Sequence, residues 1–157
     1  MTTFFLHGLD SSAQGTKGRY FSWNFPQVTC ADFFGNLAER VDQLTELTSD
    51  QAELTLIGSS FGGLMATVFA IANPKRVKRL ILLAPALNFA GFTPPQAMLD
   101  TPTLLVIGTG DLVTPPELVL PQARKTFVQL TEQLVEDDHM LHNTFQLLPW
   151  HDLIIAP

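Results

Sequence analysis

The feature that most constrains the fold of this chain is a serine enclosed by glycines, Ser60 in the sequence GSSFG at 58–62, between two apolar segments. The segment before it, 53–57, has the length and composition of a buried strand. The segment after it, 63–72, predicts a helix that ends before Asn73-Pro74. A chain that passes directly from a strand into a helix must turn sharply, and such a turn favours residues without a Cβ. We therefore expect Ser60 at the tip of a tight strand-to-helix turn.

Two interpretations of Ser60 are open at this point. A serine between glycines is common in ordinary turns, because small polar residues favour turn conformations. The strand before it and the helix after it favour a different interpretation, in which the hydroxyl is exposed at the turn as a nucleophile. The helix N-terminus behind it would favour negative charge near that hydroxyl. Ser60 is therefore the candidate nucleophile.

The composition narrows the class of protein. A chain of 157 residues, 46% of them hydrophobic, is long enough for one domain with its own core, and we expect a single domain over 1–157. The net charge is −6, from 9 basic and 15 acidic residues, and no basic stripe interleaved with aromatic residues occurs. Nucleic acid and anionic membranes are therefore not expected as partners. The sequence leaves the oligomeric state open.

Cysteine usage and the chain start bear on the compartment. Cys30 is the single cysteine, so no intrachain disulfide can form, which agrees with a reducing compartment. The N-terminal residues lack the pattern of a signal peptide, and the apolar segments fall short of the roughly 20 residues of a membrane-spanning helix. We expect a cytoplasmic protein. No His/Cys cluster has the spacing of a zinc site.

Strands alternate with helices along the chain. The continuous apolar runs at 80–84 and 103–107 are typical of strands in a parallel sheet that is covered on both faces. Prolines at 115, 116 and 121 interrupt the next region, where we expect a helix only over 122–127. Residues 132–135 fit a last strand, although the apolar spacing there also fits a helical face. The other predicted strands are 3–6 and 28–30, and the other predicted helices are 36–48 and 141–148.

This alternation predicts a three-layer α/β/α sandwich with a mostly or wholly parallel sheet of about six strands. Ligands in such sheets bind at the carboxyl ends of the strands. His7 follows the first predicted strand, Ser60 the third, Asp111 the fifth and His139 the last. A nucleophile, an acid and a base would then meet at one edge of the sheet.

Other residues compete for these roles. His142 lies three residues after His139 and is the alternative base, whereas His151 is expected at the surface. Asp137 and Asp138 adjoin His139, but side chains of sequence neighbours rarely face one another, which favours Asp111 as the acid.

The same motifs resemble the α/β-hydrolase superfamily, and most closely its small lidless bacterial serine esterase-like members. They are FLHGLDSS at 5–12, the turn around Ser60, Gly110-Asp111 and Asp138-His139. The resemblance implies a catalytic triad of Ser60 as nucleophile, His139 as general base and Asp111 as orienting acid. It also implies an oxyanion hole from the backbone N–H groups of Leu9 and Phe61.

We therefore expect a serine hydrolase that cleaves a carboxylic ester or thioester of a small to medium substrate through an acyl-serine intermediate, without a metal or organic cofactor. A short apolar segment carrying Phe89, Phe92 and Met98 is expected to bind the substrate. The alternative is a non-catalytic α/β-hydrolase-like protein that binds a small apolar ligand, because fold alone does not imply catalysis. His7 is expected to hydrogen-bond its own loop. Lys17 and Arg19 are expected to be solvated loop charges, with contact to an anionic group of the substrate as the alternative.

Overall fold

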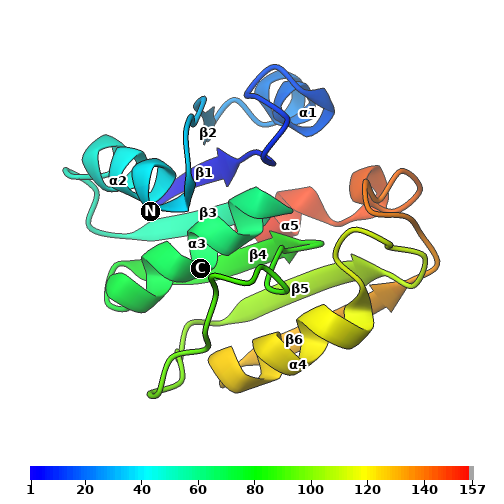
Figure 1. The fold of residues 1–157 in the computed structure, drawn as a ribbon. Helices are drawn as coiled ribbons and strands as arrows, with labels where there is room; N and C mark the ends of the chain where they lie inside the picture. The colour runs from blue at the N-terminus through cyan, green and yellow to red at the C-terminus, as the bar shows by residue number, and fades with distance from the viewer. Residues whose placement is uncertain (156–157) are drawn as a thin grey trace.

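A parallel β-sheet forms the middle layer of the protein (Figure 1). The computed structural model describes residues 1–155, and within them six strands pair in the order β2-β1-β3-β4-β5-β6, with every pair parallel. The strands are β1 (Thr2–Leu6), β2 (Val28–Cys30), β3 (Leu54–Ser59), β4 (Val77–Leu83), β5 (Thr103–Gly108) and β6 (Leu130–Val135). This is the expected α/β fold class, and the strand positions agree closely with those predicted.

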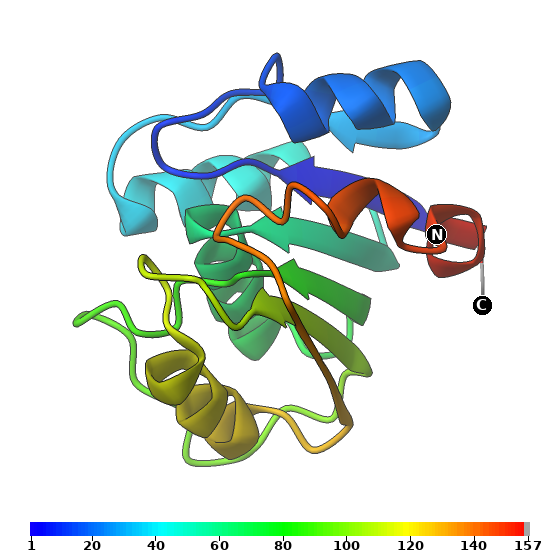
Figure 2. The ribbon, with the colours of Figure 1, turned by 90° about the vertical axis from the view of Figure 1, so that its right-hand side faces the viewer.

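Helices cover both faces of the sheet, as the turned view makes clear (Figure 2). One face carries α2, α3 and α4, and the other carries α1, α5 and the short 3-10 helix η1. The helices are α1 (Thr16–Asn24), α2 (Leu37–Leu47), α3 (Phe61–Ala72), α4 (Pro116–Thr126), η1 (Phe145–Leu147) and α5 (Trp150–Ile155).

The two cores follow from the alternation of side chains along the strands. In β4, Leu80 and Leu82 pack into the core under α2, α3 and α4, whereas Ile81 and Leu83 pack into the core under α1 and α5. Successive side chains of a strand point to opposite faces, so a strand buried on both sides must be apolar throughout. The continuous apolar runs in the sequence are present because both faces of these strands are buried.

Helix α2 begins as its sequence predicts. The Asn36 side chain accepts a hydrogen bond from the Glu39 N–H, and the Glu39 carboxylate accepts one from the Asn36 N–H. This capping box satisfies two of the free N–H groups at the start of the helix.

Helix α1 was not predicted, and the expectation of a loop at Lys17 and Arg19 is wrong. The helix has no side-chain cap and contains Gly18, which lowers helix propensity. The structure shows the reason for this glycine, since a Cβ at position 18 would lie 2.1 Å from the Ala13 carbonyl oxygen. The close packing of α1 against the preceding loop therefore requires glycine at position 18. The same glycine weakens the helix signal in the sequence.

Two further predictions about helices are wrong. Helix α4 starts at Pro116 rather than at 122, because a proline at the first helical position loses no hydrogen bond and Pro121 is tolerated inside the helix. The predicted closing helix over 141–148 is only the 3-10 turn η1, and the last helix is α5. Residues 130–135 form a strand, which confirms the predicted strand over 132–135 rather than the alternative of a helical face.

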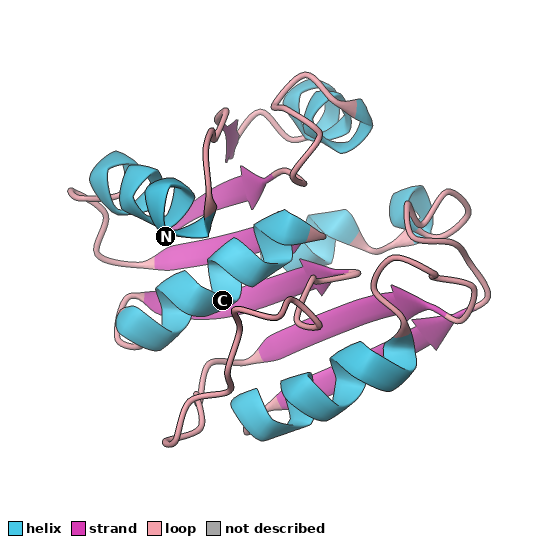
Figure 3. Ribbon diagram, in the orientation of Figure 1, coloured by secondary structure: helices cyan, strands magenta, loops and turns pink. Residues whose placement is uncertain are grey.

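The parallel strands end at one edge of the sheet, which their arrowheads mark in Figure 3. The loops that follow β1, β3, β5 and β6 therefore open on the same side. Within residues 1–155, no helix combines the length and the apolar character needed to cross a membrane.

Candidate active site

Ser60 lies between the end of β3 and the start of α3, in a backbone conformation that non-glycine residues rarely adopt. Its φ is 55° and its ψ is −115°. The conformation is held by hydrogen bonds on both sides, because the Ser60 N–H donates to the Leu83 carbonyl and the Ser60 carbonyl accepts from the Ala86 N–H. The strain places the side chain at the tip of the turn.

The glycines around Ser60 are required by close backbone approaches. A Cβ at Gly58 would lie 2.4 Å from the Gly62 carbonyl oxygen, and a Cβ at Gly62 would lie 2.0 Å from the Leu6 carbonyl oxygen. Neither contact can be relieved by a side-chain rotation, because both neighbours are backbone atoms. The crowding that the GSSFG sequence predicts is present at both positions.

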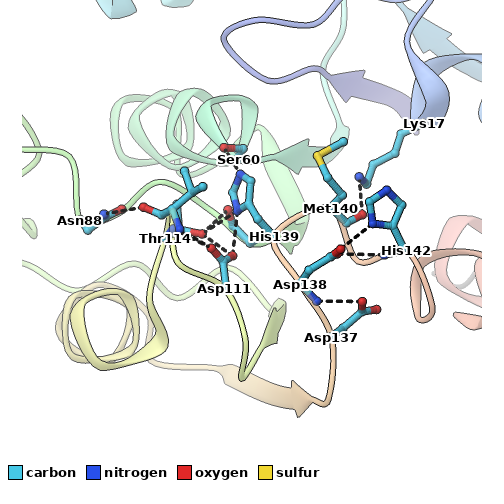
Figure 4. A network of polar contacts seen from close by, with 12 residues as sticks. Lys17, Ser60, Asn88, Asp111, Thr114, Asp137, Asp138, His139, Met140 and His142 are labelled. Carbon is cyan, nitrogen blue, oxygen red and sulfur yellow. Dashed lines mark hydrogen bonds and ion pairs between the residues drawn. The ribbon is translucent and has the colours of Figure 1, made fainter.

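Three loops bring Ser60, His139 and Asp111 together (Figure 4). His139 Nε2 lies 3.0 Å from Ser60 Oγ, and His139 Nδ1 lies 2.8 Å from Asp111 Oδ2. With Nδ1 donating to the carboxylate, Nε2 is free to accept the serine proton. This is the hydrogen-bonded order of nucleophile, base and acid that a relay of proton transfer requires.

Asp111 both orders its own turn and contacts His139. Its Oδ1 accepts hydrogen bonds from the N–H groups of Val113 and Thr114. Its Oδ2 accepts from His139 and from the Thr114 hydroxyl at 2.7 Å. One oxygen of this fully buried carboxylate therefore orders the turn, and the other contacts the imidazole.

Sequence reasoning missed Thr114, which is buried beside the acid. Its hydroxyl lies 2.7 Å from Asp111 Oδ2, 3.1 Å from His139 Nδ1 and 3.3 Å from the Ala84 carbonyl oxygen. The signal was present as an aspartate followed three residues later by a threonine, a spacing at which side chains commonly bond to nearby backbone.

Side-chain to backbone bonds fix the loop that carries His139. Asp137 Oδ2 accepts from the N–H groups of Asn143 and Thr144, and Asp137 Oδ1 accepts from Asp138 N–H. The acidic pair before His139 thus orders the loop and does not contact the imidazole. Asp138 instead bonds to His142, and that bond lowers the pKa of its exposed carboxyl.

Lys17 reaches the same loop from α1. Its ammonium donates a 2.8 Å hydrogen bond to the carbonyl of Met140, the residue after His139, and lies 5.3 Å from the centroid of the Phe145 ring. Burial lowers the pKa of Lys17, and the charges of Asp138 and Asp137 oppose that shift. The expectation of a solvated charge is wrong for Lys17, whereas Arg19 is exposed and stacks on Trp23.

The other histidines lie apart from the Ser60 hydroxyl. His142 and His151 have mostly exposed side chains. His7 is buried, with Nδ1 at 2.7 Å from the Gly8 carbonyl oxygen and Nε2 accepting a 2.9 Å bond from the Phe33 N–H. This fixes the tautomer with the proton on Nδ1, so His7 hydrogen-bonds its own loop as expected.

Leu9 and Phe61 both line the pocket at Ser60. In the part of the chain that the structure describes, neither N–H donates a hydrogen bond to a protein acceptor. Because Phe61 is the first residue of α3, its N–H also lies at the positive end of the helix dipole. Two N–H groups without a protein acceptor among residues 1–155 therefore belong to residues of the pocket wall.

The pocket has a volume of about 640 Å³, within the ordinary range for small-molecule sites. Its wall includes Ser60, His139, Phe61, Phe89 and Met140. Of the three residues expected to bind substrate, Phe89 lines the pocket. Phe92 is buried in the core under α3, and Met98 is exposed elsewhere; neither is part of the pocket wall. Across residues 1–155, no cluster of His, Cys, Asp and Glu side chains is arranged to hold a metal ion.

Comparison with known proteins identifies the family. The model of the alpha/beta hydrolase fold matches residues 10–99, so the chain belongs to the α/β-hydrolase fold family. A search of curated protein sequences gave no match.

Solved structures share the fold at low sequence identity. Alpha/beta hydrolase domain-containing protein 10 from mouse superposes with a TM-score of 0.80 at 17% identity, covering 98% of this chain and 89% of that chain. Est1E from Butyrivibrio proteoclasticus, in a structure with bound ferulic acid, gives a TM-score of 0.77 at 15% identity over 93% and 84%. A monoacylglycerol lipase from Paleococcus ferrophilus gives 0.62 at 17% identity over 87% and 83%.

Proposed function

We propose that this protein is a serine hydrolase that cleaves carboxylic esters or thioesters of small to medium size. The observation that carries the proposal is the 3.0 Å contact between Ser60 Oγ and His139 Nε2, with Asp111 Oδ2 2.8 Å from the other nitrogen of the same imidazole. A serine is a weak nucleophile by itself, and a general base within hydrogen-bond distance is what activates it.

The reaction would proceed in two halves. His139 takes the proton from Ser60 as the hydroxyl attacks the substrate carbonyl, and Asp111 stabilises the imidazolium that results. His139 then protonates the leaving alcohol or thiol, which leaves an acyl-Ser60 ester. Water enters, gives its proton to His139, and attacks the acyl carbon; His139 then returns that proton to Ser60 Oγ as the acyl–oxygen bond breaks, which releases the acid and restores the serine.

The negative oxygen of the tetrahedral intermediate would be bound by the N–H groups of Leu9 and Phe61. A single donor of this kind is typically worth about 10²–10³ in kcat. The position of Phe61 at the N-terminus of α3 adds the helix dipole to the hydrogen bond.

The pocket wall indicates the kind of acyl group. Phe61 and Phe89 meet edge to face beside Ser60, with ring centroids 5.9 Å apart, and Leu9, Val113 and Met140 add apolar surface. An alkyl or aryl acyl group would bury apolar area against these side chains. The ferulic acid in the Est1E structure is an aromatic acid, and it supports including aryl esters among the substrates tested.

Covalent labelling tests the nucleophile directly. A fluorophosphonate probe should label the wild-type protein at neutral pH and the Ser49→Ala control, and should not label Ser60→Ala. The hydrolysis of p-nitrophenyl acetate, butyrate and octanoate should disappear with the same substitution.

Two outcomes would contradict the proposal. Wild-type protein that resists the probe and hydrolyses none of the esters, yet is stabilised by apolar ligands in a thermal-shift screen, would support a non-catalytic binding protein instead. Ester hydrolysis that survives Ser60→Ala would place the nucleophile elsewhere.

A further inference from the structure

Arg40 is a buried cation that touches both residues of the proposed oxyanion hole. It lies in α2, and the residue is 5% exposed. Its Nη2 donates a 3.2 Å hydrogen bond to the Leu9 carbonyl, and its guanidinium carbon lies 5.3 Å from the centroid of the Phe61 ring. Its Nε donates a 2.9 Å bond to the Gly35 carbonyl, which fixes the plane of the guanidinium.

The burial of this side chain carries a cost to folding. Burial lowers the pKa of Arg40, and the charge of Asp10 opposes that shift, but the guanidinium stays charged at any ordinary pH. Among residues 1–155, its buried Nη1 has no hydrogen-bond partner. An apolar side chain of similar length would fill the same space without an unsatisfied donor. An apolar side chain could not supply the bonds to the Gly35 and Leu9 carbonyls, and only the second of these reaches the pocket wall.

That bond restrains Leu9 on its C-terminal side, and a bond to the preceding carbonyl restrains the Leu9 N–H itself. Each peptide unit is planar, so a carbonyl held by a hydrogen bond also fixes the N–H of the same unit. The Gly8 carbonyl, in the same peptide unit as the Leu9 N–H, accepts from His7 Nδ1. The Leu9 carbonyl, in the next unit, accepts from Arg40. With a bond to each of the two units that flank Leu9, rotation of its backbone is restricted on both sides.

The second donor is held through its side chain. The Phe61 ring contacts the Arg40 guanidinium and also meets the Phe89 ring at a centroid distance of 5.9 Å. Because Phe61 is the first residue of α3, restraint of its side chain also restrains the start of the helix. A cation over an aromatic ring is attracted more strongly where water is excluded, as it is here.

We propose that Arg40 is a positioning residue of the oxyanion hole, holding the Leu9 and Phe61 amides at a fixed separation for the oxygen of the tetrahedral intermediate. The inference rests on the proposed function. It assigns a role in the reaction to a side chain that belongs to neither the triad nor the pocket wall.

Arg40→Met tests the role, with Arg40→Lys as the conservative variant and Arg76→Met as the matched control. Arg76 also stacks on a phenylalanine of α3, with its guanidinium carbon 5.6 Å from the Phe69 centroid, and also bonds to backbone carbonyls, but it contacts the opposite end of the helix. In Arg40→Met we expect kcat for p-nitrophenyl butyrate to fall about ten-fold or more, with KM within about three-fold of wild type, because only the transition state carries the oxyanion.

Arg40→Lys keeps a charged donor but lacks the planar guanidinium with its several N–H groups. Its kcat should therefore lie between those of wild type and Arg40→Met. It also keeps the test available if Arg40→Met does not fold. A kcat in both Arg40 variants within two-fold of that of Arg76→Met would overturn the inference.

Backbone 15N relaxation separates this inference from the proposed function, because it needs no turnover. The order parameters of the Leu9 and Phe61 N–H groups should be lower in the Arg40 variants than in wild type, and unchanged in Arg76→Met. Lower order parameters in a protein that shows no Ser60-dependent hydrolysis would remove the proposed function and keep the positioning of these amides. Unchanged order parameters in both Arg40 variants would remove the inference while leaving the proposed function intact.

Discussion

The Thr114 hydroxyl donates a 2.7 Å hydrogen bond to Oδ2 of Asp111, the same oxygen that lies 2.8 Å from His139 Nδ1. The Thr114 N–H donates to Oδ1 at 2.7 Å. One residue therefore donates to both oxygens of the buried carboxylate. Bonds of this kind stabilise the charged form of an acid that has been removed from water.

Thr114→Val should weaken both stability and turnover. It preserves the shape of the side chain but leaves Asp111 with one donor fewer, which should cost about 1–3 kcal/mol of unfolding free energy. We expect kcat to fall several-fold, because the carboxylate is less firmly held against His139. Thr114→Ser keeps the hydroxyl and is the control. Urea unfolding and ester kinetics measure the two effects; a Val variant equal to the Ser variant in both would show that the hydroxyl has no role.

His139→Ala and His142→Ala distinguish the two candidate bases. The His139 imidazole lies 3.0 Å from the Ser60 hydroxyl, whereas the largely exposed His142 side chain bonds to Asp138. Loss of the base of a triad lowers kcat by about 10⁴- to 10⁶-fold, and we expect a fall in this range for His139→Ala. His142→Ala should stay within about two-fold of wild type, since its exposed ion pair contributes little. The reverse ranking in a p-nitrophenyl ester assay would mean that His142 is the base.

The fold could be predicted from the sequence because the signals that define it are local and repeated. The apolar runs of β4 and β5 are long enough to specify buried parallel strands, and the GSSFG turn between a strand and a helix fixes the centre of the sheet. The capping box at Asn36 specifies the start of α2 in the same way.

The helices and buried charges that could not be predicted depend on contacts between distant segments of the chain. Gly18 lowers the local helix propensity of α1, but tertiary packing stabilises the helix. Pro121 lowers that of α4 in the same way, although the helix tolerates a proline at that position. The burial of Lys17 and Arg40 against loops far along the chain leaves no local pattern, because a charged residue in a polar stretch is most often solvated. The convergence of three loops could be predicted because parallel strands end at one edge of the sheet, whereas the polar contacts that hold those loops could not.

Lys17→Met should impair the reaction through the loop that carries His139. The Lys17 ammonium donates to the Met140 carbonyl, so its loss frees the backbone next to the imidazole. A misplacement near 1 Å can cost about 10²-fold in rate, and we expect kcat to fall about ten-fold. Arg19→Met, in the exposed part of the same helix, is the control and should leave kcat unchanged. Equal kcat in the two variants would show that the His139 loop does not need the lysine.

The single thiol should be a poor nucleophile. Burial raises the pKa of Cys30, and a hydrogen bond with Ser22 offsets part of that shift. At pH 8.5 the folded protein should therefore react with iodoacetamide more slowly than free cysteine does. The unfolded thiol ionises at a lower pH than the folded one, so raising the pH through the unfolded pKa favours unfolding. Cys30→Ala should lose less unfolding free energy than wild type between pH 7.5 and 9.5, and an identical loss would contradict the raised pKa.

Ser60→Gly should be more stable than Ser60→Ala, although both should be inactive. The backbone of residue 60, at φ 55° and ψ −115°, lies where a Cβ is strained and glycine is not. Such strain costs on the order of 1–3 kcal/mol, and a glycine at this position removes it. Glycine also makes the unfolded chain more flexible, which lowers the free energy of unfolding by about 0.5–1 kcal/mol. We therefore expect the free energy of unfolding in urea to be about 1 kcal/mol higher for Ser60→Gly than for Ser60→Ala. A glycine variant less stable than the alanine variant would show that the turn stores no strain at this residue.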